Sequence, residues 1–194
     1  MYNLLQNKKR CSWAGSDPLY CSYHDNEWGI PVYDDNKIFE MLILEGFQAG
    51  LNWITILRKR DYFRRAFNNW DWNKIALYDN IEINRLINNK NIIRNKSKIL
   101  SAINNAKRFI EVRKEFGTFS KYMWQFTDNK IILPQKPYKS WKDVPIKTDI
   151  SDKMSKDLKK RGFTFVGSII IYSHMQAVGM VNDHILGCFK CPFK

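Results

Sequence analysis

Four residues near the two ends of the chain have side chains that zinc prefers. Cys11 and His24 lie near the N-terminus, and His184 and Cys188 lie near the C-terminus. Thiolate and imidazole are the usual ligands of closed, tetrahedral zinc sites. His184 and Cys188 are four residues apart, which places them on one helix face or on either side of a helix end. One ion bound by all four would tie the two ends together.

The cysteine pattern leaves alternatives open. Cys188 and Cys191 form a CxxC pair, so Cys191 could supply the fourth ligand. The cysteines could equally be buried or free thiols, with unrelated histidines elsewhere. Asp183 directly precedes His184, and we expect it to orient that histidine rather than to catalyse.

Length and composition predict a single domain that stays inside the cell. The 194 residues, 44% of them hydrophobic, can bury one substantial core, and no flexible linker divides residues 1–194. Residues 1–10 contain no apolar run typical of a secretory signal, so we expect a cytoplasmic protein with reduced cysteines. Residues 163–181 carry no acidic or basic side chain, but their polar residues and two glycines favour a buried helix over a membrane span.

A formal net charge of +13 indicates an acidic polymer as partner. Clustered Lys and Arg gain affinity for nucleic acids by releasing counterions from phosphates. However, residues 80–105 are crowded with Asn, Ile and Lys, a bias that an AT-rich genome produces without selection for binding. Charge alone therefore leaves nucleic-acid binding open.

Helical periodicity dominates the chain, and strand patterns are weak. Apolar residues recur at helical spacing most clearly over residues 97–115. Asp34 and Asp35 can cap a helix over residues 36–49. Three prolines exclude a continuous helix between residues 127 and 150, which predicts an irregular connection or a short extended excursion. Shorter helices are expected over residues 61–69, 81–89 and 120–126.

Two predicted helices are joined by a tight turn. Ser151 can cap a helix that runs through Arg161, Gly162 can stop it, and Gly167 can open the next one. Such a turn points backbone amides outward beside the positive end of the second helix, an arrangement that suits a DNA phosphate. The alternative is an ordinary αα-hairpin with a solvated basic face. The charge around this turn comes from Lys156, Lys159, Lys160 and Arg161.

Aromatic and polar side chains are concentrated in residues 20–29, with Trp13 before them and Trp53 after. This segment has the pattern of neither a core strand nor a core helix. Its rings could hold a flat, positively charged base by stacking and cation–π attraction, or they could simply be core. Glu45 falls on an apolar face of the 36–49 helix and should point inward. A buried carboxylate needs either a cationic neighbour or a functional role.

The chain also contains longer blocks that are distinctive in combination. They are Cys11-Ser12-Trp13, Asp17-Pro18-Leu19-Tyr20, Tyr23-His24-Asp25-Asn26-Glu27-Trp28-Gly29, Leu44-Glu45-Gly46, Gln48-Ala49-Gly50-Leu51, Lys159-Lys160-Arg161-Gly162-Phe163, Tyr172-Ser173, Met175-Gln176-Ala177 and Val181-Asn182-Asp183-His184. Together these blocks resemble 3-methyladenine DNA glycosylase I, the Tag family. The resemblance extends over nearly the whole chain, from about residue 10 to residue 188.

This resemblance implies an all-α fold of the helix-hairpin-helix DNA glycosylase superfamily, in which one structural Zn²⁺ joins the N- and C-terminal segments. Cys191 falls outside the family's ligand pattern and remains a reserve ligand. The implied zinc ligands are Cys11, His24, His184 and Cys188. The implied pocket for the excised base is formed by Trp13, Tyr20, Tyr23, Trp28, Glu45 and Trp53.

The resemblance also implies base-excision repair, in which the N-glycosidic bond of 3-methyladenine in double-stranded alkylated DNA is hydrolysed and free 3-methyladenine is released. A base inside a duplex cannot reach such a pocket, so the nucleotide must be flipped out. Methylation at N3 makes the adenine cationic and a better leaving group. We expect Glu45 to recognise this base, and it is also the candidate catalyst, while Trp53 and Tyr23 stack. The expected DNA contacts are Lys159, Lys160, Arg161, Gly162 and Gly167.

Two further expectations concern the reaction and the assembly. Bifunctional glycosylases of this superfamily use a lysine just after the hairpin, and residues 167–170 supply none, so we predict no β-lyase activity. We expect a monomer.

The competing functional classes are a noncatalytic DNA-binding module, which would not need Glu45, and a metal-dependent nuclease. A closed site with four protein ligands disfavours the nuclease because it leaves no coordination position for substrate.

Overall fold

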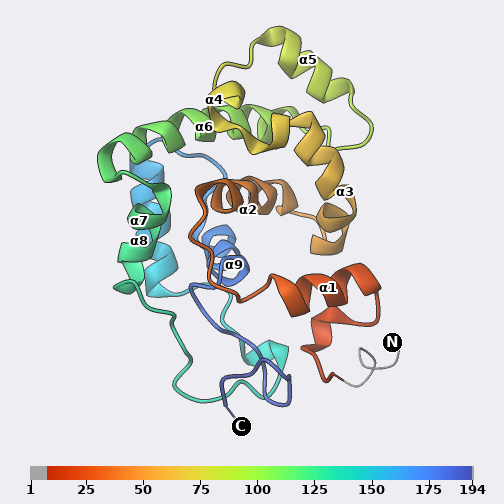
Figure 1. The fold of residues 1–194 in the computed structure, drawn as a ribbon, viewed down its shortest axis with the longest axis vertical. Helices are drawn as coiled ribbons and strands as arrows, with labels where there is room; N and C mark the ends of the chain where they lie inside the picture. The colour runs from red at the N-terminus through yellow and green to blue at the C-terminus, as the bar shows by residue number, and fades with distance from the viewer. Residues whose placement is uncertain (1–7, 194) are drawn as a thin grey trace.

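The computed structural model describes residues 8–193, and its regular elements in that range are helices (Figure 1). Within the described residues, the only strand-like pairing is an isolated parallel bridge between Ile132 and Val181. The all-helical prediction is therefore confirmed. The α-helices are α1 (Pro18–Asn26), α2 (Asp35–Gln48), α3 (Trp53–Ala66), α4 (Trp72–Ile75), α5 (Asn80–Asn88), α6 (Lys96–Phe116), α7 (Phe119–Trp124), α8 (Asp149–Lys160) and α9 (Ser168–Ala177). The short 3₁₀ helices are η1 (Ser12–Ala14), η2 (Asn68–Trp70), η3 (Gln125–Thr127) and η4 (Trp141–Asp143).

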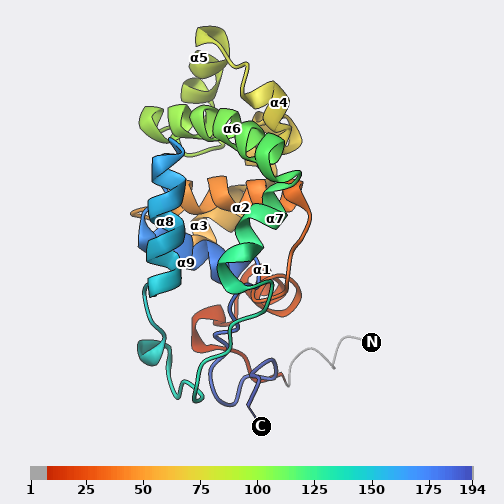
Figure 2. The same cartoon turned by 90° about the vertical axis from the view of Figure 1, so that its left-hand side faces the viewer.

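Helix α2 runs through the centre of the molecule and packs against α3, α6, α7 and α9 (Figure 1). Phe39, Leu44 and Phe47 of this helix are fully buried, which makes it the axis of the core. Figure 2 shows α6 across one side of α2 and α9 on the other side, while α4 and α5 lie beyond α6. The described parts of both terminal segments lie at the opposite end of the molecule, close to α1 (Figures 1 and 2).

Side-chain caps explain where several helices begin. Asp17 accepts a hydrogen bond from the backbone amide of Leu19 at 2.9 Å at the start of α1. Asp34 caps α2 as the sequence predicts, with the amide of Lys37 at 2.9 Å. Each cap satisfies an amide that has no partner within its helix. At the other end, Gly162 follows α8 with φ of +87°, a conformation that glycine adopts without steric penalty.

Four details of the predicted elements are corrected. Residues 18–26 form helix α1. The sequence lacks a helical apolar stripe there because different faces of α1 meet the cavity and the Cys/His cluster. Helix α3 begins at Trp53, not at residue 61; its many arginines and lysines hid the periodicity. Helix α8 is capped by Thr148, and Ser151 is the third helical residue of the same capping box. The buried helix expected over residues 163–181 is limited to α9.

Two expectations about location have different outcomes. None of the described helices is long and apolar enough to cross a membrane. Most of the first ten residues, which we expect to carry no secretory signal, lie outside the described residues.

Candidate active site

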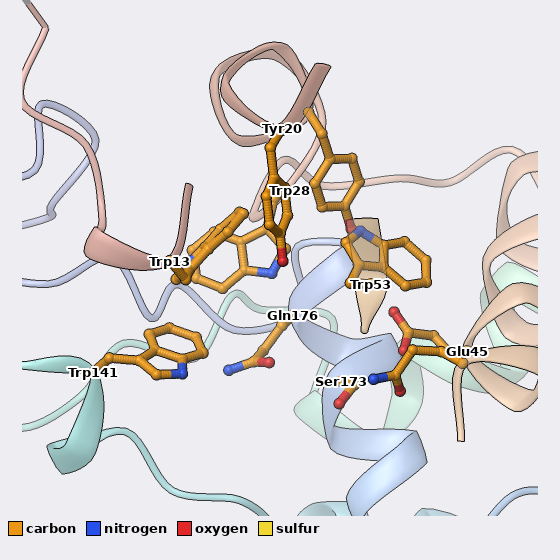
Figure 3. Close-up of a pocket in the computed structure, with 10 residues that line it drawn as sticks. Trp13, Tyr20, Trp28, Glu45, Trp53, Trp141, Ser173 and Gln176 are labelled. Atoms are coloured by element: carbon orange, nitrogen blue, oxygen red, sulfur yellow. The ribbon is translucent and has the colours of Figure 1, made fainter. Parts of the chain in front are cut away.

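A cavity of about 170 Å³ opens between α1, α2, the start of α3 and α9 (Figure 3). All six residues that the sequence analysis assigns to the base pocket lie around it, together with four that it does not assign to the pocket. The lining residues are Trp13, Tyr20, Tyr23, Trp28, Glu45, Gln48, Trp53, Trp141, Ser173 and Gln176. The cavity therefore brings together side chains that are far apart in the sequence, from Trp13 to Gln176.

The aromatic wall is built from rings that meet at an angle. The ring of Trp13 lies 5.0 Å from that of Tyr20 and 5.0 Å from that of Trp28. Tyr23 and Trp53 form a second pair at 5.5 Å. These distances are typical of favourable aromatic pairs. Figure 3 shows Trp13 and Trp53 on opposite sides of the cavity, so a flat ligand between them would meet aromatic surface on both sides.

Two buried indole donors at this cavity lack a hydrogen-bond partner. The Nε1 atoms of Trp13 and Trp53 are both buried, and no acceptor among the described residues reaches them. Buried polar groups in folded proteins are nearly always hydrogen-bonded. Both rings line the cavity, but their Nε1 atoms are enclosed, and the Nε1 atoms of Trp70 and Trp72, which do not line it, are also buried and without a partner among the described residues.

Glu45 is a buried carboxylate without a cationic partner. Its side chain is 4% exposed, and it forms no ion pair or hydrogen bond with any described residue. Burial raises the pKa of Glu45 from 4.5 to about 8. Figure 3 shows the carboxylate near Trp53 at the cavity. Of the two possibilities left open by the sequence, a functional role is therefore favoured over a structural ion pair.

The structural ion pair is formed by the neighbouring carboxylate instead. Glu40 is also only 4% exposed, and it accepts hydrogen bonds from Arg60 Nε at 2.9 Å and from Arg64 Nε at 2.8 Å. Despite the opposing effect of burial, these arginines lower the pKa of Glu40 to about 2. Arg60 also donates to Glu27 at 2.8 Å. No local sequence pattern indicates this network, because its members come from α2, α3 and the residue that follows α1.

The hydroxyls of the two pocket tyrosines stay protonated. Burial, reinforced by the nearby negative charge of Glu45, raises the pKa of both Tyr20 and Tyr23. Both hydroxyls can therefore donate hydrogen bonds over the whole physiological pH range.

The four predicted metal ligands converge into one buried cluster. Their ligand atoms all lie within 4.8 Å of one another. Cys11 Sγ is 3.5 Å from His184 Nδ1, and Cys188 Sγ is 3.4 Å from His24 Nε2 and from His184 Nδ1. Ligand atoms on a tetrahedral zinc ion, with bonds of about 2.0 to 2.3 Å, are roughly 3.5 Å apart. The donor set and its spacing fit a single metal ion.

Cys191 lies outside this cluster. It is partly exposed, and its amide donates to the carbonyl of Cys188 at 3.0 Å. A hydrogen bond from the Cys11 thiol, supported by the imidazoles, lowers the pKa of Cys188 despite its burial. The cluster therefore provides a thiolate, the form of cysteine that binds metals.

The orientation of the histidines differs from the sequence prediction. Asp25 Oδ1 contacts His24 Nδ1 at 2.9 Å, and Arg10 holds the same carboxylate with contacts of 2.9 and 2.8 Å. Asp183 does not orient His184; it accepts hydrogen bonds from Tyr172 and Gln176 instead, each at 2.7 Å. A carboxylate behind a ligating histidine fixes the ring and its tautomer. Asp25, the residue next to His24 on the same helix, is placed for that role if the cluster holds an ion.

The metal-ligand cluster and the cavity share a wall. The ring of Trp28 lies 4.6 Å from that of His184, edge to face, and is stacked on that of His24 at 6.3 Å. Trp13 also contacts His24, at 5.2 Å. Displacement of either histidine would therefore move a tryptophan that lines the cavity.

The tight turn between α8 and α9 is clamped by α6. The side-chain amide of Asn105 donates to the carbonyl of Thr164 and accepts from the amide of Thr164, both at 2.9 Å. Asn104 donates to the carbonyl of Gly162 at 2.8 Å. Gly167 is the N-cap of α9, and no side chain caps that helix, so its first amides remain open.

The basic residues before the turn are not equivalent. Lys159 and Lys160 are exposed. Arg161 is held by Asp157 at 2.7 Å and by Glu115 at 2.6 Å, and its guanidinium also lies over two aromatic rings. The ammonium groups of the two lysines are accessible to a ligand from solvent. Arg161 is instead held by other side chains, so it has a structural role in addition to any contact with DNA.

Comparison with known proteins identifies the relationship. The model of the methyladenine glycosylase family matches residues 13–191, which is most of the chain. The chain belongs to the methyladenine glycosylase family. DNA-3-methyladenine glycosylase 1 of Escherichia coli (strain K12) is 45% identical over 184 residues, or 95% of this chain and 97% of that protein. The predicted family and enzyme class, a DNA-3-methyladenine glycosylase, are confirmed.

Solved structures agree with this relationship. A crystal structure of 3-methyladenine DNA glycosylase I has a TM-score of 0.91 and 46% identity, and the match covers 95% of this chain and 100% of that one. A variant of 3-methyladenine DNA glycosylase I, solved in complex with 3-methyladenine, has a TM-score of 0.89 and 32% identity, with 94% and 97% covered. The fold of this glycosylase is therefore that of its relatives.

The sequence of this glycosylase did not indicate that four further residues line the cavity. Ser173 and Gln176, like Gln48, belong to the family blocks, but they look like ordinary polar residues of an apolar helix. Gln48 lies three residues after Glu45, one helical turn away, and this spacing could have placed it on the same face. Trp141 lies in the proline-containing connection, where no periodicity exists to place it.

Proposed function

We propose that this protein excises 3-methyladenine from alkylated double-stranded DNA as a monofunctional glycosylase, with the flipped base held in the aromatic cavity. The observation that carries the proposal is the buried carboxylate of Glu45, which has no cationic partner among the described residues and lines a cavity walled by aromatic rings. A cationic base that presents an amino group would supply the missing partner of this carboxylate and would stack on the rings.

Glu45 is proposed to recognise the charge of the base. Burial without a cation disfavours its ionised form, so a positively charged base restores the missing partner. Neutral adenine cannot do so, and selectivity for the methylated base follows from this difference. Tyr20, Tyr23, Trp28 and Trp53 supply stacking surface and keep water away from the base.

The chemical step needs little from the protein. Water adds to the sugar carbon, the electron pair of the glycosidic bond passes to the base, and its positive charge is neutralised. Glu45 is the only carboxylate among the residues that line the cavity, so it is the candidate to accept the proton of the attacking water. Residues 167–170 provide no lysine to attack the sugar, and no strand cleavage is expected.

A structural zinc ion is proposed for Cys11, His24, His184 and Cys188. Four protein ligands close the coordination shell, so the ion would stabilise the fold without contacting the substrate. Because His24 and His184 contact Trp28, the ion would also hold the cavity wall. Elemental analysis should find one zinc per chain.

The turn between α8 and α9 is proposed to be the hairpin of a helix-hairpin-helix motif that binds the DNA backbone. The open amides after Gly167, the left-handed Gly162 and the exposed Lys159 and Lys160 support this assignment. Arg161 would contribute mainly by holding α8 in place. We further propose that residues 1–194 form one domain that acts as a monomer.

The decisive experiment is release of free base from DNA treated with a methylating agent. The wild-type protein should release 3-methyladenine and leave the strand intact, whereas Glu45→Gln should lose at least tenfold in rate. Glu111→Gln, on the exposed face of α6, is the matched control. DNA binding without base release by the wild type would instead support a noncatalytic binding module. Nicking that a chelator abolishes would support a nuclease.

A further inference from the structure

Trp141 lines the cavity on the side away from Glu45. It belongs to η4, in the connection between α7 and α8. Figure 3 shows its indole below Trp13 and across the cavity from Glu45 and Trp53. Its side of the cavity contains no other aromatic ring from that connection.

The indole of Trp141 extends the aromatic wall. Its ring lies 6.2 Å from that of Trp13 and 5.9 Å from that of Trp28, tilted by 60° and 58°. These are aromatic-pair distances, so Trp141 is packed against the wall rather than projecting freely into solvent. It is nevertheless 38% exposed, because its remaining surface lies on a second cavity.

This second cavity, of about 280 Å³, adjoins the first. The two share only three lining residues, Trp141, Ser173 and Gln176. Ser173 is small, and Gln176 is held by its hydrogen bond to Asp183. The large side chain of Trp141 is therefore the main partition between the two cavities.

The backbone around Trp141 is built to hold it there. Ser140 and Asp143 form a capping box, in which the amide of Ser140 donates to Asp143 Oδ2 at 2.8 Å. The carbonyl of Tyr138 accepts from the amide of Leu186 at 2.8 Å, and Val144 is buried. The partition is thus anchored to the C-terminal segment that also carries His184.

We propose that Trp141 is a specificity-determining residue, which closes the base pocket opposite Glu45 and excludes alkylated purines larger than 3-methyladenine. The inference rests on the proposed use of the first cavity as the base pocket. Removal of the indole would join that pocket to the second cavity. The enlarged space would hold 3-methyladenine less tightly and would admit bulkier bases, because a lost wall removes both contacts and steric exclusion.

The test compares the affinities of two free bases, 3-methyladenine and 3-benzyladenine, measured by isothermal titration calorimetry. Trp141→Ala should weaken binding of 3-methyladenine about tenfold, which is within the range for loss of an aromatic contact to a base. The same variant should weaken the binding of 3-benzyladenine less, or strengthen it, so that the ratio of the two affinities changes by about tenfold or more. Trp141→Phe should retain most of the wild-type preference.

Ile146→Ala is the matched control, because Ile146 lines only the second cavity and is largely exposed. It should leave both affinities unchanged. Equal losses for both bases in Trp141→Ala, or no loss for either, would overturn the specificity role. A wild-type protein that binds neither base would instead refute the proposed function. Thermal unfolding confirms that each variant is folded, and Trp141→Leu carries the test should the alanine variant fail to fold.

Discussion

Replacing Glu45 by glutamine is expected to stabilise the protein at alkaline pH, although the same change should damage activity. Glutamine has the shape of the neutral carboxylic acid and cannot ionise. Glu45 has no cationic partner among the described residues, and burial raises its pKa from 4.5 to about 8. The folded protein therefore binds more protons than the unfolded chain between these two pKa values. Its unfolding free energy falls across that interval as the pH rises.

The magnitude follows from the two pKa values. A tenfold change in an ionisation equilibrium corresponds to about 1.4 kcal/mol. The raised pKa of Glu45 therefore lowers the unfolding free energy by about 4 kcal/mol at pH 8 and by less than about 1 kcal/mol at pH 5. For a chain of this length, each kcal/mol shifts the Tm by about 2 to 4 °C. Glu45→Gln should therefore melt roughly 10 °C above wild type at pH 8 and only about 2 °C above it at pH 5.

The assay is thermal unfolding of both proteins in parallel at the two pH values. Effects of pH on the metal-ligand cluster are common to both proteins and cancel in the difference. Glu111→Gln, which removes an exposed carboxylate, should give the same Tm difference at both pH values. Equal Tm values for wild type and Glu45→Gln at pH 8 would refute the reasoning, since they would mean that Glu45 is compensated or hydrated in the folded state.

Three further predictions concern other parts of the structure. Cys188→Ser should reduce the zinc content below one ion per chain and lower the Tm, and prolonged chelation of the wild type should do the same; an unchanged Tm after complete zinc loss would contradict a stabilising role. Asn105→Ala should weaken DNA binding, measured by fluorescence anisotropy, and leave the affinity for free 3-methyladenine unchanged, because Asn105 holds the hairpin through Thr164; equal losses in both would point to general unfolding. Arg60→Met should destabilise by about 3 to 5 kcal/mol in urea unfolding, because it leaves the buried carboxylate of Glu40 without its buried partner. Arg58→Met, which breaks an exposed pair, should change the stability by less than about 1 kcal/mol.

Much of the fold could be predicted because its signals are local. Helix α6 appears in the periodicity of its apolar residues, and α2 in its cap at Asp34 and its inward-facing Glu45. Helix α1 could not be predicted in this way. Its faces serve the cavity, the metal-ligand cluster and the ion pairs of Glu27, so its apolar residues follow no single stripe.

The residue types and spacings alone determined which side chains could do chemistry here. They offered Cys11, His24, His184 and Cys188 as possible metal ligands, with Cys191 or free thiols as alternatives, and helical geometry directed Glu45 inward. Only the tertiary structure decided which residues these side chains contact. Asp25, not Asp183, contacts a histidine of the metal-ligand cluster; Glu40, not Glu45, has the buried arginine; and Trp141 reaches the cavity from a segment without periodicity. Each of these facts depends on contacts between segments far apart in the chain, which local sequence patterns do not encode.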